Sequence, residues 1–391
     1  MQTQPRPKNA ATAPLGETSR PVVLGARTLN RALLTRQLLL QRADMPVADV
    51  LEHLVGMQAQ APNPPYFGLW TRLRGFRQDD LSRLLLDRRA VRIALMRSTI
   101  HLVTACDSLI LRPLMQSVYE RGLSGSYGRR LTGLDLEAVA AAGRILVEEQ
   151  PRTLGELGKL LSEQWPDHDP AALANAVRAL VPLVQVPPRG IWGDGGQATH
   201  TSAKAWLGQS LVSAPSLEET ILRYLAAFGP ATVKDIQVWS GLTRLRETID
   251  RLRPRLSVYK SEDGSELFDV PGAPLPGPDT PAPPRFLGEF DNMLLSYADR
   301  TRILADEYRP LVCTENGIVR ATILVDGFVR GIWRIVRQRR TATLVIEPFE
   351  PLTGEDCEAL AEEGRGLLDF AAADADVRDI QFVSPELRSQ P

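Results

Sequence analysis

Hydrophobic residues along most of this chain recur every three to four positions, the spacing that places them on one face of an α-helix. Read in order, the pattern repeats one plan three times, with three helices followed by a short β-hairpin. A helix-turn-helix that leads into a two-stranded wing is the winged-helix plan. The pattern therefore predicts an α+β protein with three tandem winged-helix motifs.

The third copy, over residues 213–272, shows the plan most clearly. Ser216 and Thr232 each begin a capping box, in which side chains satisfy the free backbone amides at a helix start. A third helix opens at Thr243, and two strands then flank the Asp-Gly pair at 263–264. Asp-Gly between two strands is the strongest short-range signal for a β-hairpin, so this copy ends in a wing.

The first two copies follow the same order less strictly. The second covers residues 131–212 and ends in two short strands around a glycine-rich loop. The first covers residues 22–130, and its apolar, β-branched stretch over 91–103 predicts one strand. Alternate residues of a strand share a face, which would gather Arg97 and His101 on one polar side. Two interpretations stay open: this polar side lines a cleft, or it is simply the solvent-exposed face of the strand.

The spacing of hydrophobic residues changes after a proline-rich linker over residues 273–285. Three apolar segments separated by short turns lie between residues 317 and 349, followed by an acidic amphipathic helix and a last short strand. A meander of this kind is most simply closed on itself, so residues 286–391 are predicted to form a small β-barrel with an acidic helix. Three winged helices and a barrel would make a concave frame that grips a duplex along its length.

Composition narrows the class of protein. Hydrophobic residues make up 43% of the chain and charged residues 24%, as in soluble globular proteins. No apolar run approaches the roughly 18 residues of a membrane span. Residues 1–21 lack the apolar core of a secretory signal and predict a disordered leader rich in Pro, Ala and Thr.

Cysteine and histidine usage bears on compartment and cofactors. Three distant cysteines argue for a reducing compartment and against a disulfide framework, so we expect a cytoplasmic protein. The four histidines lack metal-ligand spacing, and no metal or other cofactor is predicted.

The charge is distributed unevenly although the formal net charge is only −1. Residues 320–340 carry six arginines against one aspartate, and residues 347–391 carry twelve acidic residues against three arginines. Only five of the 46 basic residues are lysine. Two explanations stay open: a GC-rich genome, or phosphate binding by the guanidinium fork.

The best candidate for chemistry is the pair Gln58 and Gln60 in the stretch GMQAQAPNPPYFGLW. The chain has no phosphate-binding glycine loop and no nucleophile elbow. If the backbone is extended here, both amides point the same way and Ala59 turns inward. The prolines that follow would hold the loop rigid. The alternative is that the two amides are merely solvated at a helix end.

This stretch resembles the Gln-apolar-Gln signature of the AlkZ-type DNA glycosylases. The resemblance continues through RSTIHLV, THTSAKAWLG and FDNMLLSYADRTRIL, and covers nearly everything after residue 22. It implies three winged helices and a β-barrel in a C-shape, with Gln58 and Gln60 as the catalytic pair. It also implies excision of bulky N-alkylated purines, unhooking of interstrand crosslinks and self-resistance to a DNA-alkylating natural product.

The resulting prediction is a monofunctional DNA N-glycosylase, since no lysine lies near the motif to form a covalent intermediate. Its partner would be double-stranded DNA that carries alkylated purines, and a frame complete in one chain favours a monomer. Two alternatives stay open: a winged-helix regulator without catalysis, and a protein that sequesters the alkylating drug.

Phosphate contacts are expected from arginines in the barrel strands and at the barrel entrance, and from the polar side of the first wing. The alternative for each is a solvated surface side chain. The candidates are Arg97, His101, Arg300, Arg302, Arg330, Arg334, Arg337, Arg339 and Arg340.

Overall fold

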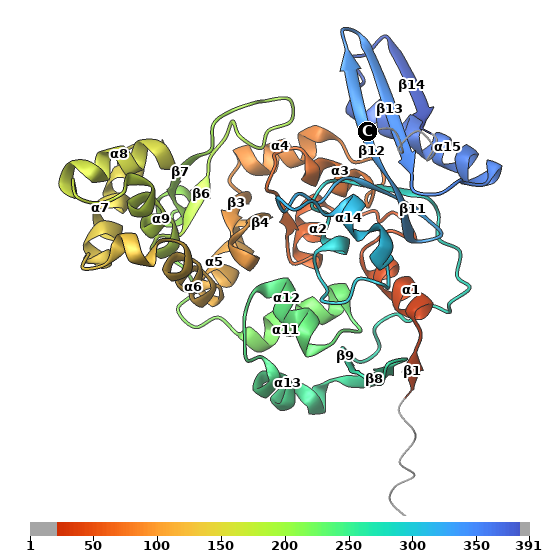
Figure 1. The fold of residues 1–391 in the computed structure, drawn as a ribbon, viewed down its shortest axis with the longest axis horizontal. Coiled ribbons are helices and arrows are strands. Elements are labelled where there is room, and N and C mark those ends of the chain that lie inside the picture. Colours follow the sequence, from red (N-terminus) through yellow and green to blue (C-terminus); the bar gives the residue numbers. More distant parts are fainter. Residues whose placement is uncertain (1–21, 384–391) are drawn as a thin grey trace, which may run out of the picture.

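The computed structural model describes residues 22–383 of the 391-residue chain. The expected leader over residues 1–21 lies outside the described residues. Three groups of elements surround a centre made by α2, α3, β3 and β4 (Figure 1). The α7–α9 group lies to the left of this centre in that view, the α11–α13 group below it, and a blue sheet with α15 at the upper right.

The N-terminal part of the chain supplies this centre, with six α-helices and the start of the largest sheet. The helices are α1 (Ala26–Arg36), α2 (Val47–His53), α3 (Pro64–Trp70), α4 (Gln78–Leu86), α5 (Ala105–Leu114) and α6 (Gln116–Tyr127). The single strand predicted over residues 91–103 is wrong. The chain instead forms β3 (Ala90–Ala94) and β4 (Ile100–Thr104), antiparallel neighbours joined by a 3₁₀ turn over Met96–Ser98. The chain reverses there because Arg97 and Ser98 adopt left-handed conformations, with φ of 56° and 59°.

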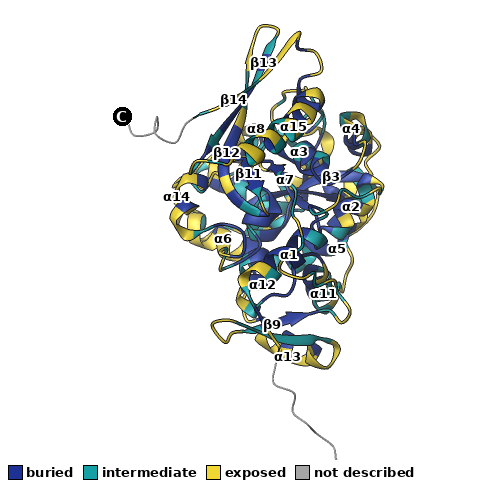
Figure 2. Cartoon of the chain, turned by 90° about the vertical axis from the view of Figure 1, so that its right-hand side faces the viewer, coloured by how far each residue is buried: buried dark blue, intermediate teal, exposed yellow. Residues whose placement is uncertain are grey.

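The hairpins predicted as the first and second wings share one six-stranded sheet, in the order β2-β4-β3-β6-β7-β5. The two wings join where β3 pairs with β6, with Ile93 opposite Val184. The remaining strands are β2 (Met57–Gln58), β5 (Arg152–Thr153), β6 (Leu183–Gln185) and β7 (Thr199–Ser202). Every residue of β3 is buried, and the dark blue core lies around this strand and α1 (Figure 2).

The α7–α9 and α11–α13 groups follow the predicted order of helices. The helices are α7 (Leu136–Glu149), α8 (Leu154–Gln164), α9 (Pro170–Leu180), α10 (Ala203–Leu207), α11 (Leu217–Phe228), α12 (Val233–Ser240) and α13 (Arg246–Leu252). Thr232 and Asp235 form the expected capping box. The hairpin predicted as the third wing, called the third wing below, consists of β8 (Ser257–Ser261) and β9 (Glu266–Asp269), and β1 (Val23–Leu24) adds to it parallel to β8.

The C-terminal region is an open sheet, and the predicted barrel is wrong. Its strands run in the order β10 (Arg285–Leu287), β11 (Thr322–Val325), β12 (Phe328–Gln338), β13 (Thr341–Pro348) and β14 (Val377–Phe382). The outer strands β10 and β14 each pair with one neighbour only. Helix α15 (Gly354–Ala371) packs Leu360, Leu367 and Leu368 into the cluster that holds Leu344 of β13. The helix therefore buries the apolar face that a closed barrel would have buried.

The linker between β9 and β10 has no helix or strand, yet α1 fastens it. Arg27 donates to the Pro278 carbonyl at 2.8 Å, Arg31 to that of Thr280 at 2.6 Å and Arg36 to that of Pro274 at 3.1 Å. Arg36 also forms a buried ion pair with Asp269 of the third wing at 2.7 Å. Helix α1 therefore ties the third wing and the linker to the centre of the molecule.

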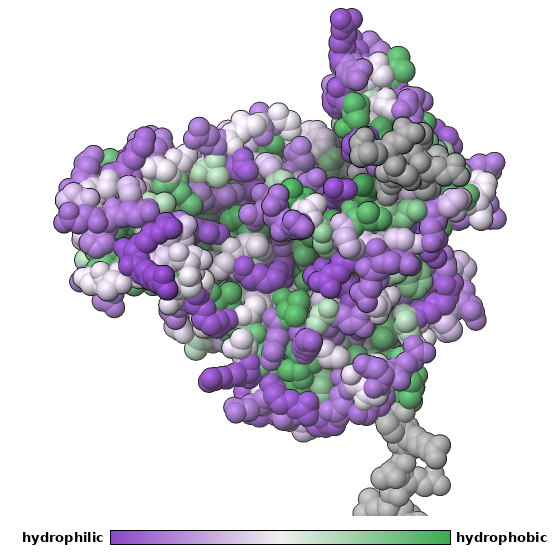
Figure 3. All heavy atoms as spheres, in the orientation of Figure 1, coloured by the Kyte–Doolittle hydropathy of each residue, from purple (hydrophilic) through white to green (hydrophobic). Residues whose placement is uncertain are grey.

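The surface shown in Figure 3 is mostly hydrophilic, with hydrophobic residues in scattered patches. No helix within residues 22–383 combines the length and apolar character needed to cross a membrane.

Candidate active site

The Gln-Ala-Gln segment begins on β2, at the edge of the large sheet, with Gln58 as the last residue of the strand and Ala59 and Gln60 directly after it. After α2 the chain reverses through Val55 and Gly56, with φ of 54° and 88°. A Cβ on Gly56 would lie 2.5 Å from a methyl carbon of Val103, so only glycine fits. The reversal brings Gln58 opposite His101 of β4 in an antiparallel pair.

Gln58 is almost fully buried, at 6% exposure. Its Oε1 accepts a hydrogen bond from Nη2 of Arg97 at 2.7 Å. Asn292 holds the backbone at Gln58 and at Gly56 before it. Its Nδ2 donates to the Gly56 carbonyl at 2.8 Å, and its Oδ1 accepts from the backbone N–H of Gln58 at 3.4 Å. Both the side chain and the backbone of Gln58 are therefore fixed from outside its own strand.

Gln60 is exposed, and its Oε1 accepts from the backbone amide of Ile100 at 3.2 Å. Between the two glutamines, Ala59 is fully buried. Its amide donates to the Ile100 carbonyl at 2.7 Å, and its carbonyl accepts from Nη2 of Arg92 at 2.8 Å. The expectation that Ala59 turns inward is confirmed, and the segment is held at three consecutive residues.

Hydrogen-bond donors hold both amide oxygens. A guanidinium and a backbone N–H can only donate, so the oxygen of each amide must be the atom that faces them. Each glutamine keeps its Nε2 hydrogens and a second lone pair on Oε1 for other partners. Two fixed neutral amides can orient a water molecule, although they cannot take up a proton as a carboxylate or imidazole would.

Arg97 and His101 do not form the shared polar strand face expected from the sequence. Arg97 lies in the turn before β4, and its guanidinium is directed at Gln58 and at the Trp239 carbonyl. Burial and the neighbouring Arg300 lower the pKa of Arg97 to about 10, so it stays charged at neutral pH. His101 is 2% exposed, and burial lowers its pKa to about 3. A buried neutral imidazole presents nothing to phosphate in this conformation.

The two arginines at the predicted barrel entrance differ. Arg302 is 6% exposed, donates to the Pro230 carbonyl at 2.8 Å and packs on the Tyr297 ring, which removes it from a phosphate-binding surface. Arg300 is half-buried, and its Nη1 contacts the sulfur of Cys313 at 3.4 Å. Its buried Nε has no hydrogen-bond partner among the described residues.

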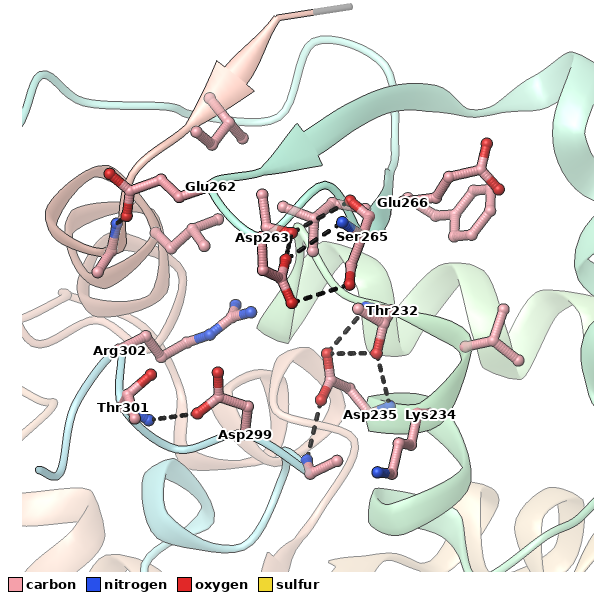
Figure 4. A pocket seen from close by; sticks show the side chains of 18 of the residues that line it. Thr232, Lys234, Asp235, Glu262, Asp263, Ser265, Glu266, Asp299, Thr301 and Arg302 are labelled. Atoms are coloured by element: carbon pink, nitrogen blue, oxygen red, sulfur yellow. Dashed lines mark hydrogen bonds between the residues drawn. The ribbon is translucent and has the colours of Figure 1, made fainter. Parts of the chain in front are cut away.

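Arg302 lines a hollow between the third wing, α12 and the 298–302 segment (Figure 4). The Asp235 carboxylate is already bound, to the Thr232 amide at 2.8 Å and to the Ala298 amide at 2.9 Å. Acidic side chains outnumber basic ones here, which disfavours a phosphate ligand. The acidic residues are Asp235, Glu262, Asp263, Glu266 and Asp299, and the basic ones are Lys234, Arg246 and Arg302.

The arginines expected on the barrel strand lie on β12 and its following turn, and most of them face carboxylates on β13 or on the segments that follow β13 and α15. The charge asymmetry of the sequence is therefore largely compensated within the C-terminal region. Arg339, in the turn, has no ion-pair partner among residues 22–383. The ion pairs are Arg330 with Glu350, Arg334 with Glu347, Arg337 with Asp374 and Arg340 with Asp376.

The sequence pattern missed the residues that support the glutamines from behind. Arg72 and Asp291 form a buried two-bonded ion pair, with both contacts at 2.8 Å, directly before Asn292. Arg92 is buried against the Ala59 carbonyl. The stretch FDNMLLSYADRTRIL was a signal for Asp291 and Asn292, but their partners lie more than 200 residues away. Within the described residues, no group of three or more His, Cys, Asp and Glu could hold a metal ion.

Comparison with known proteins gives concordant results. The family model for AlkZ-like DNA glycosylases matches residues 51–370. An interstrand DNA cross-link repair glycosylase of Streptomyces sahachiroi is 25% identical, over 80% of this chain and 88% of that protein. The solved structure of the Streptomyces sahachiroi DNA glycosylase AlkZ has the same fold, with a TM-score of 0.77 at 21% identity, over 93% of this chain and all of that one. The chain therefore belongs to the AlkZ-like DNA glycosylase family and is an enzyme of the hydrolase class, a DNA N-glycosylase.

Proposed function

We propose that this chain is a monofunctional glycosylase that hydrolyses the N-glycosidic bond of bulky N7- or N3-alkylated purines in double-stranded DNA, interstrand crosslinks included. Its role would be self-resistance to a DNA-alkylating natural product. The observation that carries the proposal is the fixed pair of neutral amides at Gln58 and Gln60, held by Arg97 and by the Ile100 amide. The relative named for interstrand cross-link repair supports the same substrate class.

The chemistry of alkylated purines explains why neutral amides suffice. Alkylation at N7 or N3 places a positive charge on the base, so the glycosidic bond breaks with its electron pair on the base, which leaves neutral. No general acid is needed to protonate this leaving group. Water oxygen bonds to C1′ and releases its proton to solvent. Gln58 and Gln60 orient that water, and their amide dipoles favour the developing charge on the sugar.

Phosphate contacts in this proposal come from arginines around the turn over Met96–Ser98. Arg178 donates to the Ser98 carbonyl at 2.9 Å and Arg121 to the Gly241 carbonyl at 2.6 Å, while Arg300 lies close enough to Arg97 to lower its pKa. None of Arg121, Arg178 and Arg300 forms an ion pair with a carboxylate in the described part of the chain. Positive charge beside the glutamines is therefore not compensated, which suits a polyanion.

The β12 arginines remain candidates for phosphate only if they exchange their carboxylate partners. Exposed ion pairs contribute roughly 0–1 kcal/mol to stability. Replacing a carboxylate by a phosphate therefore costs each arginine little, but it also adds little net affinity for DNA. Arg339 needs no exchange. We therefore place the stronger contribution to DNA affinity at the turn beside the glutamines.

The test is incubation with a duplex that carries a bulky alkylpurine, followed by detection of heat-labile abasic sites. Changing both Gln58 and Gln60 to Ala should lower the cleavage rate by on the order of 10²–10³-fold, the usual loss when fixed catalytic dipoles are removed. Duplex affinity should stay within a few-fold. Gln209→Ala, at an exposed glutamine outside the site, is the matched control.

Three outcomes would contradict the proposal. A double variant that forms abasic sites as fast as the wild type would show that the glutamines are not catalytic. A wild type that binds the duplex but forms no abasic sites would favour a non-catalytic regulator. Binding of the free alkylating compound without duplex affinity would favour sequestration.

A further inference from the structure

Arg97 is held in an unusual backbone conformation by contacts from three directions. Both Arg97 and Ser98 have a left-handed backbone conformation, which residues other than glycine rarely adopt. Nη1 of Arg97 donates to the Trp239 carbonyl, and Arg178 donates to the carbonyl of Ser98. Gly241 packs so closely that a Cβ there would lie 3.2 Å from the Arg97 backbone. Conformations of this kind persist only where the surroundings impose them, and they cluster at functional sites.

The consequence of this arrangement is the orientation of one amide. The guanidinium has five N–H donors and no acceptor, so it can face only the oxygen of Gln58. If the amide flipped, two sets of donors would meet at 2.7 Å. The Nε2 hydrogens of Gln58 must therefore point away from Arg97. Burial of Gln58 strengthens this preference, since a donor or acceptor withdrawn from water loses more when it is unpaired.

We propose that Arg97 is a positioning residue for the reaction, which holds the Gln58 amide in one orientation so that the second lone pair of its Oε1 can accept a hydrogen bond from the reacting water. The inference rests on the proposed function of Gln58. It separates Arg97 from the phosphate contacts predicted from the sequence: Arg97 acts through Gln58 and touches neither base nor backbone of the DNA. Without it, Gln58 can rotate about its last side-chain bond, and the productive orientation is only one of two.

The first test is a double-mutant cycle on single-turnover cleavage of an alkylated duplex. Arg97→Ala should lower the rate constant by about 10–100-fold, as expected for a misplaced catalytic group. Gln58→Ala should lower it at least as much, and the double variant should be no slower than Gln58→Ala alone. The slope of log affinity against log salt should stay that of the wild type, whereas a lost phosphate contact lowers it by about 0.9. Arg144→Ala, at an exposed arginine of α7, is the matched control.

A second measurement reads the amide directly. The side-chain NH₂ signals of Gln58, identified by their loss in Gln58→Ala, should be sharp in the wild type and broadened or shifted in Arg97→Ala. Arg97→Lys keeps the charge but has one donor group for two acceptors, so its loss of rate should be intermediate. If Arg97→Ala does not fold, Arg97→Lys replaces it in the cycle.

Several results would overturn the inference. One is that Arg97→Ala lowers the cleavage rate by the same factor in the wild type and in the Gln58→Ala background. Another is a fall of the salt slope by about 0.9, which would make Arg97 a phosphate contact. A third is a lower melting temperature with an unchanged rate for the folded protein, which would make its role purely structural. A Gln58→Ala variant with wild-type rate would instead overturn the proposed function itself.

Discussion

The buried ion pair of Arg72 and Asp291 offers the sharpest test of how the site is supported. Both side chains are almost inaccessible, at 0% and 1% exposure, and two hydrogen bonds of 2.8 Å join them. Asp291 also accepts from the Met293 amide at 3.0 Å, which shapes the turn that carries Asn292. The pair therefore connects α3, the helix after the glutamines, to the residue that holds Gln58.

Asp291→Ala should lower the free energy of unfolding by about 3–5 kcal/mol, because it leaves the Arg72 cation buried without a partner. That is a large share of the roughly 5–15 kcal/mol that stabilises a typical domain. Replacing both residues, with Arg72→Met and Asp291→Leu, should recover most of the loss, since a buried pair and an apolar pair of similar volume are close in free energy. The missing bond to Met293 should leave a residual loss of about 1 kcal/mol.

The assay is urea unfolding followed by fluorescence and by circular dichroism, with the slope against denaturant compared between variants. Arg330→Ala is the control, because its contact with Glu350 is long, at 3.8 Å, and half-exposed, so its removal should change stability by less than about 1 kcal/mol. The reasoning is refuted if Asp291→Ala costs no more than this control. It is refuted equally if the apolar double variant is as unstable as Asp291→Ala.

Three further predictions follow from single contacts. Burial lowers the pKa of His101 to about 3 from an unfolded value near 6.5. The stability that depends on a neutral His101 is therefore complete above pH 6.5 and declines as the pH falls toward 3. In His101→Gln, the free energy of unfolding should change between pH 6 and 4 by about 1.4 kcal/mol per pH unit less than in the wild type. Gly264→Ala should cost about 1–2 kcal/mol for its positive φ alone, and Gly241→Ala should cost more in thermal unfolding, because its Cβ also meets backbone at 3.2 Å. Arg121→Ala should lower the salt slope of duplex binding by about 0.9, and Arg337→Ala, whose cation is already paired, should lower it by less.

The local elements could be read from the sequence because short-range rules decide them. The capping box at Thr232 and the hairpin at Asp263-Gly264 form where the pattern predicted, since helix starts and tight turns depend on neighbouring residues. The turn after α2 could not be read in this way. Gly56 is needed there because Val103 of β4 lies against it, a contact that no local pattern contains.

The role of charged residues was the part least visible in the sequence. Six arginines over residues 320–340 suggested a phosphate-binding strand, but acidic residues that follow in the sequence fold back beside β12 and its turn and pair with most of them. The open C-terminal sheet has a similar cause, because α15 covers the face that closure would have buried. Pairing and coverage of this kind depend on which distant segments meet.

Sequence alone established the family resemblance, the α+β class, the order of helices and hairpins, and the two glutamines as the candidate pair. Only the tertiary structure joined two wings into one sheet, placed His101 and Arg302 in the interior, and set Arg97 against Gln58. The reason is physical: periodicity reports which face of an element is buried, whereas the partner that buries it is chosen by contacts between residues far apart in the chain.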